Sequence, residues 1–352
     1  MAKLLFKKGS FKILCENVGG LYASGTNKLI KRAGTVSHQS RDRTQKSPKE
    51  FVRMLQSMGH MSVLEHSWYV FRIYGSLGII AKLFLSNSLF CISTNANSFL
   101  ISGNARMFLE GYKKTENRVL GQLLDFLHKR NPVLFPAPQD GFKKADIEFE
   151  YNPELKTKKE KLLHIAVTIE FNNHSRGFTH EDVRSRNGDG KVVAYTQEST
   201  RYVDYSKEED GEKEMEFVLP YREISSNQIV DRSIIFLRSN HREYKFTIDE
   251  FTDLLEDWYK RLRGLGLKPE EARQWLPIGI KSQIVQTYNL NEWRHWLKIR
   301  AQKPAHLEIR TTAVELLKTF QKIFPNVFDD FKIGRKKNNT PYAAYIGKEE
   351  LA

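Results

Sequence analysis

The sequence predicts a layered fold of the α/β or α+β class. Segments with strand character alternate with helical segments through the first two thirds of the chain, and the last third is mainly helical in pattern. The chain has 352 residues, of which 40% are hydrophobic and 12% aromatic, so it can bury a substantial core. This composition excludes a largely disordered protein.

The first regular elements are expected to be a helix, a strand and a longer helix. Residues 47–58 start with Ser47 as a cap and Pro48 in the first turn, which is typical of a helix start. Residues 67–74 (SWYVFRIY) are aromatic and β-branched, which predicts a strand. A helical period then continues over 107–130.

The middle of the chain mixes surface segments with buried ones. Residues 136–161 are rich in charge and proline and predict a surface excursion, and the acidic run 206–217 predicts a solvated loop. Residues 162–171 (LLHIAVTIEF) predict a strand. Lys82 and several polar residues interrupt the most apolar stretch, 76–93, so it predicts a buried element and not a membrane span.

The C-terminal third predicts helices followed by a basic tail. The helices are expected at 248–263, 269–288 (with or without a break near Pro277), 289–300 and 307–324. Residues 1–330 are expected to form a single domain, and the basic segment 331–352 a mobile tail.

Charge and cysteine content limit the classes of function. The net charge of +14 favours anionic partners, either nucleic acid or phosphorylated small molecules, without separating the two. Cys15 and Cys91 form neither a metal-type cluster nor a redox pair, so we expect no metal site and no disulfide scaffold, as suits a reducing cytoplasm. The N-terminal stretch 1–14 lacks a long apolar run and a cleavage site, so we do not expect a signal peptide.

Four polar segments carry candidate chemistry, and each also has a purely structural interpretation. Ser62 and Glu65 in GHMSVLEH have the spacing of a helix capping box, but the two histidines, serine and glutamate of this segment also suit a ligand rim. Glu181 and Arg184 in RGFTHEDVRSR lie one helical turn apart, as in an ordinary surface ion pair.

The third segment is YTQESTRYVDY. If it is extended, Gln197, Ser199 and Arg201 project to one side and offer an amide, a hydroxyl and a guanidinium, which suit a phosphate. The structural alternative is the polar face of a half-buried strand. No serine–histidine–carboxylate set follows in sequence, so we do not expect Ser199 to be a nucleophile.

The fourth segment combines PEEARQWLP with NLNEWRHWLKIR. Glu270 and Arg273 share one helical face in the first part. One helical stripe of the second part carries Asn289, Trp293, Trp296 and Arg300. This stripe either faces the core or delivers an arginine to an aromatic-lined pocket for a nucleobase or flavin.

Together and in this order, these segments resemble the flavin-dependent thymidylate synthase family. GHMSVLEH resembles the family's early histidine–serine/threonine–glutamate segment. HEDVRSR followed by AYTQESTRY resembles its signature of arginine–histidine–arginine, seven residues and a serine. EEARQWLP and NLNEWRHWLKIR resemble its nucleotide and flavin segments, and PAHLEIR resembles the closing helix. The matches cover about residues 30–75 and 162–325.

The resemblance implies an α+β fold with a central, mostly antiparallel sheet flanked by helices and a helical C-terminal third. It implies that deoxyuridylate (dUMP) is bound by Glu181, Arg184, Gln197, Ser199, Arg201, Arg273 and Arg300. It implies that FAD is bound by Ser37, His60, Ser62, Glu65, Arg186, Asn289 and His295. The catalytic candidates that it implies are Arg300 and Ser199.

The implied reaction is reductive methylation of dUMP to dTMP, with methylenetetrahydrofolate as carbon donor, NADPH as reductant and FAD as cofactor. The implied assembly is a homotetramer in which each active site combines residues of several subunits. We expect a cytoplasmic enzyme with neither a membrane nor a nucleic-acid partner.

Two departures from the family pattern leave the product and the activity open. The middle histidine of the signature is Ser185 here, and the spacer 187–198 has twelve residues, including a glycine turn at 187–191. With these changes, water could trap the one-carbon intermediate and give 5-hydroxymethyl-dUMP. The sequence is also compatible with a relative that has lost flavin and with a basic nucleic-acid-binding protein. An inserted region at about 76–161 has no assigned chemical role.

Overall fold

The computed structural model describes most of the chain. The described residues are 3–5, 9–16, 25–37, 45–75, 78–79, 81, 83, 89–95, 97–185, 193–206, 214–219, 235–239 and 242–347. The flavin contact expected at Arg186 and the inserted glycine turn at 187–191 therefore fall outside the described residues, as do most of the acidic run 206–217 and part of the apolar stretch 76–93.

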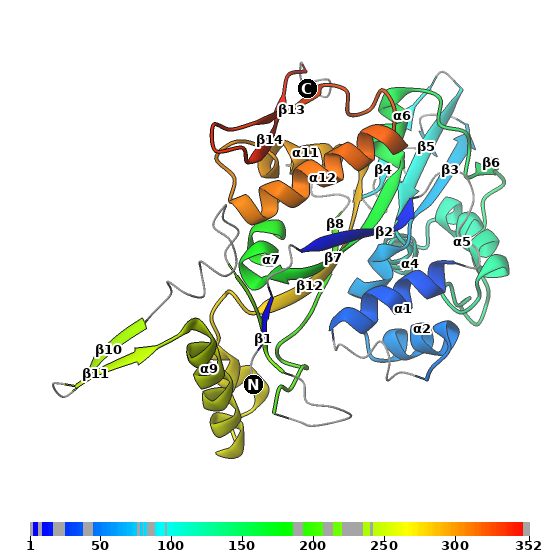
Figure 1. The fold of residues 1–352 in the computed structure, drawn as a ribbon. Coiled ribbons are helices and arrows are strands. Elements are labelled where there is room, and N and C mark those ends of the chain that lie inside the picture. Colours follow the sequence, from blue (N-terminus) through cyan, green and yellow to red (C-terminus); the bar gives the residue numbers. More distant parts are fainter. Residues whose placement is uncertain are drawn as a thin grey trace.

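A four-stranded antiparallel sheet forms the centre of the molecule (Figure 1). In spatial order its strands are β2 (Ser10–Glu16), β7 (Ala166–Ser175), β12 (Lys281–Asn289) and β8 (Val193–Gln197). Successive side chains of a strand face opposite sides of a sheet. Ile284 and Val285 of β12 accordingly enter two different apolar cores, because helices cover both faces.

Three helices cover one face of this sheet. They are α7 (Arg176–Asp182), α11 (Leu290–Arg300) and α12 (Leu307–Ile323). Their core includes the fully buried side chains of Phe171, Trp293, Trp296 and Phe320. Burying a large aromatic side chain contributes roughly 2–3 kcal/mol, so this cluster fixes α11 firmly on the sheet.

The opposite face carries the N-terminal helices and a second sheet. The helices are α1 (Thr26–Ser37), α2 (Pro48–Ser57), the 3₁₀ helix η1 (Met61–His66), α4 (Ala105–Thr115) and α5 (Arg118–Arg130). The second sheet is antiparallel, in the order β4 (Cys91–Thr94), β5 (Ser98–Gly103), β3 (Tyr69–Tyr74), β6 (Glu148–Tyr151). The described part of the 76–161 region thus builds a structural layer with its own share of the core.

The remaining elements form smaller units. The short helix α6 (Lys158–His164) leads into β7, and α9 (Ile248–Gly264) packs with Val203, Tyr205 and residues 215–219 in a third core. Two small sheets are formed by β1 (Lys3–Leu5) with β9 (Glu216–Val218) and by β10 (Ile235–Ser239) with β11 (Arg242–Phe246). The β10–β11 hairpin projects away from the body in Figure 1.

The structure confirms the predicted α+β class with antiparallel sheets, and several helices and strands agree closely with the sequence. Ser47 caps α2 in a complete capping box with Glu50. The helix expected over 107–130 is instead two helices, because Glu116 adopts a left-handed conformation (φ 48°) and Asn117 caps a new helix.

The helix expected over 269–288 is wrong for most of its length. The helical part is confined to α10 (Pro269–Ala272) and the 3₁₀ turn η2 (Arg273–Trp275). Residues 281–289 form β12, which pairs with a strand on each side. Pairing along both edges and burial on both faces outweigh the helical pattern that the sequence suggested.

The C-terminal segment also differs from the expected mobile tail. β13 (Phe331–Arg335) and β14 (Pro341–Tyr345) form a hairpin, and the Ala343 N–H donates to the Ala301 carbonyl (2.8 Å). Phe331 and Ala343 are buried in the core of the central sheet. Within the described residues, the structure contains no helix whose length and apolarity would let it cross a bilayer.

Candidate functional site

Polar residues gather where β8 ends at Gln197. The chain turns immediately afterwards, with the Tyr202 N–H donating to the Ser199 carbonyl (3.0 Å). Gln197, Ser199 and Arg201 therefore do not share one face of an extended strand, as the sequence predicted. The turn instead carries Thr200 and Arg201 toward the segment that contains α10 and η2.

Two contacts join this turn to the α10–η2 segment. Arg273 Nη1 donates to Thr200 Oγ1 (3.2 Å), and Arg201 Nε lies 4.0 Å from Glu270 Oε1. The Arg201 side chain is 59% exposed. Two guanidinium groups from distant parts of the chain thus meet beside the end of β8.

Helices α1 and α7 complete the surroundings of this turn. Gln197 Nε2 donates to Thr179 Oγ1 of α7 (2.6 Å), and the Ser199 N–H donates to the carbonyl of Ser37 at the end of α1 (3.0 Å). Ser37, which the sequence associates with FAD, therefore lies beside the residues associated with dUMP.

Arg176, at the start of α7, is a member of this cluster that the sequence motifs did not reveal. Arg176 Nη1 donates to the Glu198 carbonyl (3.0 Å). Burial lowers the pKa of Arg176, the Glu198 carboxylate opposes this effect, and the nearby Arg273 guanidinium lowers the pKa further. Mutual repulsion among cations brought together in this way is relieved by a bound anion. The signal in the sequence was the position of Arg176 at a strand–helix junction.

The first turn of α7 is firmly held. Ser175 caps the helix, and Glu308 of α12 accepts bonds from the Ser175 N–H (2.8 Å) and hydroxyl (2.6 Å). Burial alone would raise the pKa of Glu308, but hydrogen bonds from His174 and Ser175 lower it overall. Glu308 therefore fixes the start of α7 as a charged acceptor.

A second polar cluster lies at the other end of α7. Arg300 of α11 donates through Nε to Ser185 Oγ (2.8 Å) and through Nη2 to the Glu181 carbonyl. Its Nη1 lies 3.7 Å from Glu181 Oε2, and His306 Nδ1 lies 3.6 Å from Glu181 Oε1. A guanidinium has five N–H donors, so these two hydrogen bonds leave three for other acceptors.

A buried carboxyl, Asp182, supports this second cluster. Asp182 Oδ1 accepts from Trp296 Nε1 (2.7 Å), and the Gln286 amide, when oriented to donate, lies 3.0 Å from the same oxygen. Burial raises the pKa of Asp182 to about 7, although Trp296, Arg300 and Gln286 each lower it. Burial thus favours the protonated form of this carboxyl.

The GHMSVLEH segment forms η1 and lies against β8. No capping box forms between Ser62 and Glu65; His60 begins η1 without a side-chain cap. Glu65 pairs with Arg106 (2.7 Å). The buried imidazole of His66 bonds Thr196 Oγ1 and Thr287 Oγ1 (both 2.9 Å). Because Thr196 directly precedes Gln197 on β8, η1 lies next to the end of this strand.

Helix α11 orients its aromatic residues to the core. Trp293 and Trp296 are fully buried, so they do not line an open pocket as the functional interpretation of their stripe required. Asn289 caps the helix: its Oδ1 accepts from the Glu292 N–H (2.8 Å). His295 is half-buried on the same helix.

The two ends of α7 separate the two polar clusters. Arg176 and Asp182, at the two ends of α7, lie roughly 9 Å apart along the helix axis at about 1.5 Å per residue, whereas Thr179, which Gln197 contacts, lies only two residues before Glu181. A ligand with an anionic end and a polar ring would match this spacing. No group of three or more histidine, cysteine or acidic side chains suited to a metal ion occurs in the part of the chain described here.

Comparison with known proteins identifies the family. Residues 157–326 match the family model described as "Thymidylate synthase complementing protein". The flavin-dependent thymidylate synthase of Corynebacterium efficiens is 32% identical over 186 residues, which are 52% of this chain and 68% of that enzyme. The chain belongs to the flavin-dependent thymidylate synthase family. The Corynebacterium glutamicum member is 32% identical over 190 residues, covering 51% of this chain and 70% of its own.

A solved structure adds little to this assignment. A UMP/dUMP methylase from Streptomyces cacaoi, bound with 5-Br UMP, aligns over 93% of this chain and 95% of its own. The identity is 13% and the TM-score 0.37, which is too loose a superposition to support an argument.

In this member of the family, the expected site residues fall into groups. The cluster at the end of β8 contains Ser37, Gln197, Ser199, Arg201 and Arg273. The cluster at the end of α7 contains Glu181 and Arg300. The η1 group contains His60, Ser62 and Glu65, whereas Asn289 and His295 lie on α11. Arg184 is exposed just beyond α7.

Proposed function

We propose that this enzyme methylates dUMP to dTMP, using methylenetetrahydrofolate as carbon donor, NADPH as reductant and FAD as bound cofactor. The observation that carries the proposal is the meeting of Arg176, Arg201 and Arg273 beside Gln197 at the end of β8. The names of the related proteins in Corynebacterium support the same reaction.

We assign the β8 cluster to the phosphate of dUMP. Its planar guanidinium groups bind two phosphate oxygens each, and the Gln197 amide and Ser199 hydroxyl supply further polar contacts. Arg201 is exposed enough to reach a ligand, and the Arg273 bond to Thr200 uses one of its five N–H donors. Arg184, exposed beyond α7, is assigned to the nucleotide as well.

We assign Arg300 to the uracil ring. The guanidinium is held by Ser185 and Glu181, so it is positioned before any ligand arrives. A fixed cation beside the uracil carbonyl stabilises the negative charge that develops there and makes C5 nucleophilic. The length of α7 between Arg300 and the β8 cluster fits the separation of base and phosphate in one nucleotide.

The residues near η1 fit a flavin. His60 is half-buried and Ser62 exposed, so both offer hydrogen-bonding groups at the surface, next to the β8 cluster. FAD, when bound, supplies the hydride that no side chain can provide. Asn289 does not fit as a direct contact, because its amide caps α11 and donates to the Leu163 carbonyl (3.2 Å).

We further propose a homotetramer in which neighbouring protomers complete each site. The β8 cluster is open to solvent at Arg201, and His60 with Ser62 presents a second polar surface. Enclosing a nucleotide and a flavin between such surfaces requires further walls, which neighbouring copies of the chain can supply.

Hydroxymethylation of dUMP is a second candidate that one observation favours. Ser185 stands where the family signature has histidine, and its small hydroxyl accepts from Arg300 Nε (2.8 Å). Serine lacks the imidazole of the family signature, and in its place we propose that water adds to the one-carbon intermediate and gives 5-hydroxymethyl-dUMP.

One experiment tests both candidates. The purified protein, reconstituted with FAD, is reduced anaerobically by NADPH and mixed with dUMP and methylenetetrahydrofolate. Methylation predicts reoxidation of the flavin spectrum that depends on dUMP, with dTMP as product. Mass spectrometry separates dTMP from the hydroxymethyl product by one oxygen. A protein that takes up no FAD, or forms neither product, would refute the proposal.

A further inference from the structure

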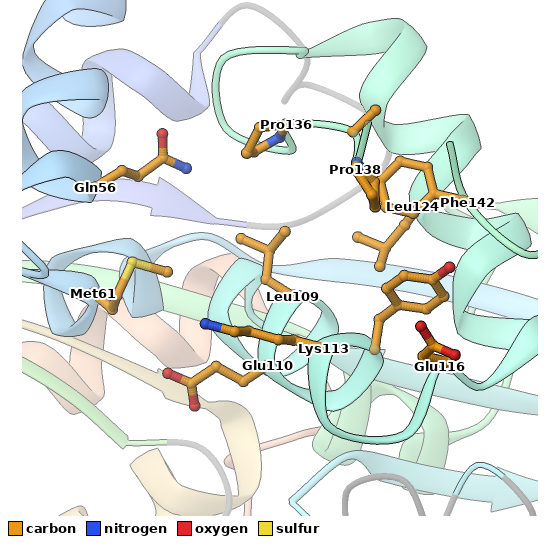
Figure 2. Close-up of a pocket in the computed structure, with 12 residues that line it drawn as sticks. Gln56, Met61, Leu109, Glu110, Lys113, Glu116, Leu124, Pro136, Pro138 and Phe142 are labelled. Carbon is orange, nitrogen blue, oxygen red and sulfur yellow. The ribbon is translucent and has the colours of Figure 1, made fainter. Parts of the chain in front are cut away.

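A separate cavity of about 650 Å³ lies outside the groups described above (Figure 2). Its walls come from α2, η1, α4, α5 and the segment 136–142. Almost all of this wall belongs to the 76–161 region, and all of it precedes residues 157–326 that match the family model. The volume falls within the range of small-molecule sites, roughly 300–1,000 Å³.

The floor of the cavity is apolar. Leu124 is fully buried and Phe142 is 8% exposed, while Leu109 and Met61 pack against the same core. Figure 2 shows Leu109 in the middle of the cavity, with Leu124 and Phe142 toward one end and Gln56 toward the other. A flat apolar body could lie across this floor and lose its contact with water.

The cavity walls are held in place by tertiary contacts. Gln56 Nε2 donates to the Leu134 carbonyl (3.0 Å), which leaves its amide oxygen as an acceptor. The Tyr112 hydroxyl accepts from the Lys143 N–H (2.7 Å), which leaves its own hydrogen to donate. A side chain at Gly121 of α5 would collide with the Lys143 carbonyl. Only glycine at this position lets the backbone at Lys143 approach α5 so closely.

The carboxylates at the rim are engaged by cations. Glu110 accepts from Arg106 Nε (2.6 Å), and Glu116 pairs with Lys143. Lys113, which also lines the cavity, has no carboxylate within ion-pair distance among the described residues. Among the described residues of the rim, the ammonium group of Lys113 thus has no carboxylate partner, and a carboxylate of a ligand would complement it.

We propose that this cavity binds an aromatic carboxylate that also carries an N–H donor. The ring lies over Leu109 and Phe142, the carboxylate pairs with Lys113, and the N–H donates to the Gln56 amide oxygen. Two sources share this chemistry: the aminobenzoyl-glutamate end of a folate, and a free aromatic acid that is not a substrate. The first source rests on the proposed function, whereas the binding itself does not.

The cavity adjoins the η1 group, so a ligand in it would contact the same short helix. Met61 lines the cavity and lies between His60 and Ser62 in the chain. Arg106 bonds Glu110 at the rim and Glu65 in η1 at the same time. Occupancy of the cavity is therefore linked to the position of η1.

Calorimetric titration with p-aminobenzoyl-glutamate tests the proposal. The full-length protein should bind it, and Lys113→Ala should weaken binding about fivefold, as expected for a partly exposed ion pair. Lys114→Ala is the matched control, because Lys114 follows on α4 but does not line the cavity. Absence of binding at millimolar concentration, or equal affinity in both variants, would overturn the proposal.

A second variant blocks the cavity without disturbing the core. Ala137 lines the cavity and is exposed, so Ala137→Trp should fill the space, abolish binding and leave the unfolding temperature unchanged. Undiminished binding by a folded Ala137→Trp would also overturn the proposal.

Competition distinguishes the two sources. If methylenetetrahydrofolate displaces p-aminobenzoyl-glutamate and binds more weakly to Ala137→Trp, the cavity holds the folate tail. If the two bind independently, the cavity serves a separate aromatic acid. Both results are consistent with a binding site in this cavity. Neither measurement requires turnover, so the conclusion about binding does not depend on whether the enzyme methylates dUMP.

Discussion

Replacing Asp182 with asparagine should change how the stability of this enzyme depends on pH. Burial raises the pKa of Asp182 from 3.8 to about 7. The folded protein therefore retains a proton on this carboxyl at pH values where the unfolded chain has released it. The contribution of Asp182 to the free energy of unfolding therefore falls as the pH rises from about 4 to about 7, and it stays constant at higher pH.

The structure sets the size of this effect. A tenfold change in proton affinity corresponds to about 1.4 kcal/mol, so the displacement of this pKa from 3.8 to about 7 costs at most about 4 kcal/mol above neutral pH. Asparagine has the same shape without the charge. Its oxygen can still accept from Trp296 Nε1, and a rotated Gln286 amide can accept from its nitrogen.

Urea unfolding measured from pH 5 to pH 9 tests this prediction. Asp182→Asn should exceed the free energy of unfolding of the wild type by a margin that grows by about 1.4 kcal/mol per pH unit from pH 5 to about pH 7 and then stays constant. Asp257→Asn, at an exposed position on α9, is the control and should follow the wild type throughout. Parallel curves for wild type and Asp182→Asn would show that Asp182 is ionised normally in the fold.

Three further predictions concern single groups. Arg300→Ala should lower turnover by about 10²–10³ with an unchanged circular dichroism spectrum, and unaltered turnover would reject its role at the uracil ring. Glu308→Gln should weaken the hold on Ser175 and lower the free energy of unfolding by about 1–3 kcal/mol in urea titrations; an unchanged midpoint would contradict the anchoring of α7. Replacing Cys15 and Cys91 together with alanine should preserve turnover, and its loss would point to a thiolate mechanism.

The sequence predicts elements well where local signals agree with the tertiary structure. The helix at 48–57 and the helices at 290–300 and 307–323 lie close to their expected positions. Cap residues mark the first two, and the apolar period alone marks the third. The strand at 281–289 could not be predicted in this way. Its conformation depends on pairing with two strands that are distant in sequence.

The candidate site likewise combines residues that local motifs predict with residues that only tertiary contacts bring in. Gln197, Ser199, Arg201 and Arg273 come together as the motifs indicated, although the extended geometry expected for the first three is wrong because the chain turns at 199–202. Arg176 joins them through tertiary contacts that no spacing rule encodes. The tryptophans of α11 were ambiguous in sequence because a core-facing stripe and a pocket-facing stripe have the same period.

The most direct test of the phosphate cluster compares the affinities of dUMP and deoxyuridine by calorimetry. We predict that the wild type prefers dUMP and that Arg273→Ala loses about 10- to 100-fold of that preference, with deoxyuridine binding unchanged. Arg261→Ala, at an exposed position on α9, should behave as the wild type. An equal preference for dUMP in all three proteins would show that the nucleotide phosphate binds elsewhere.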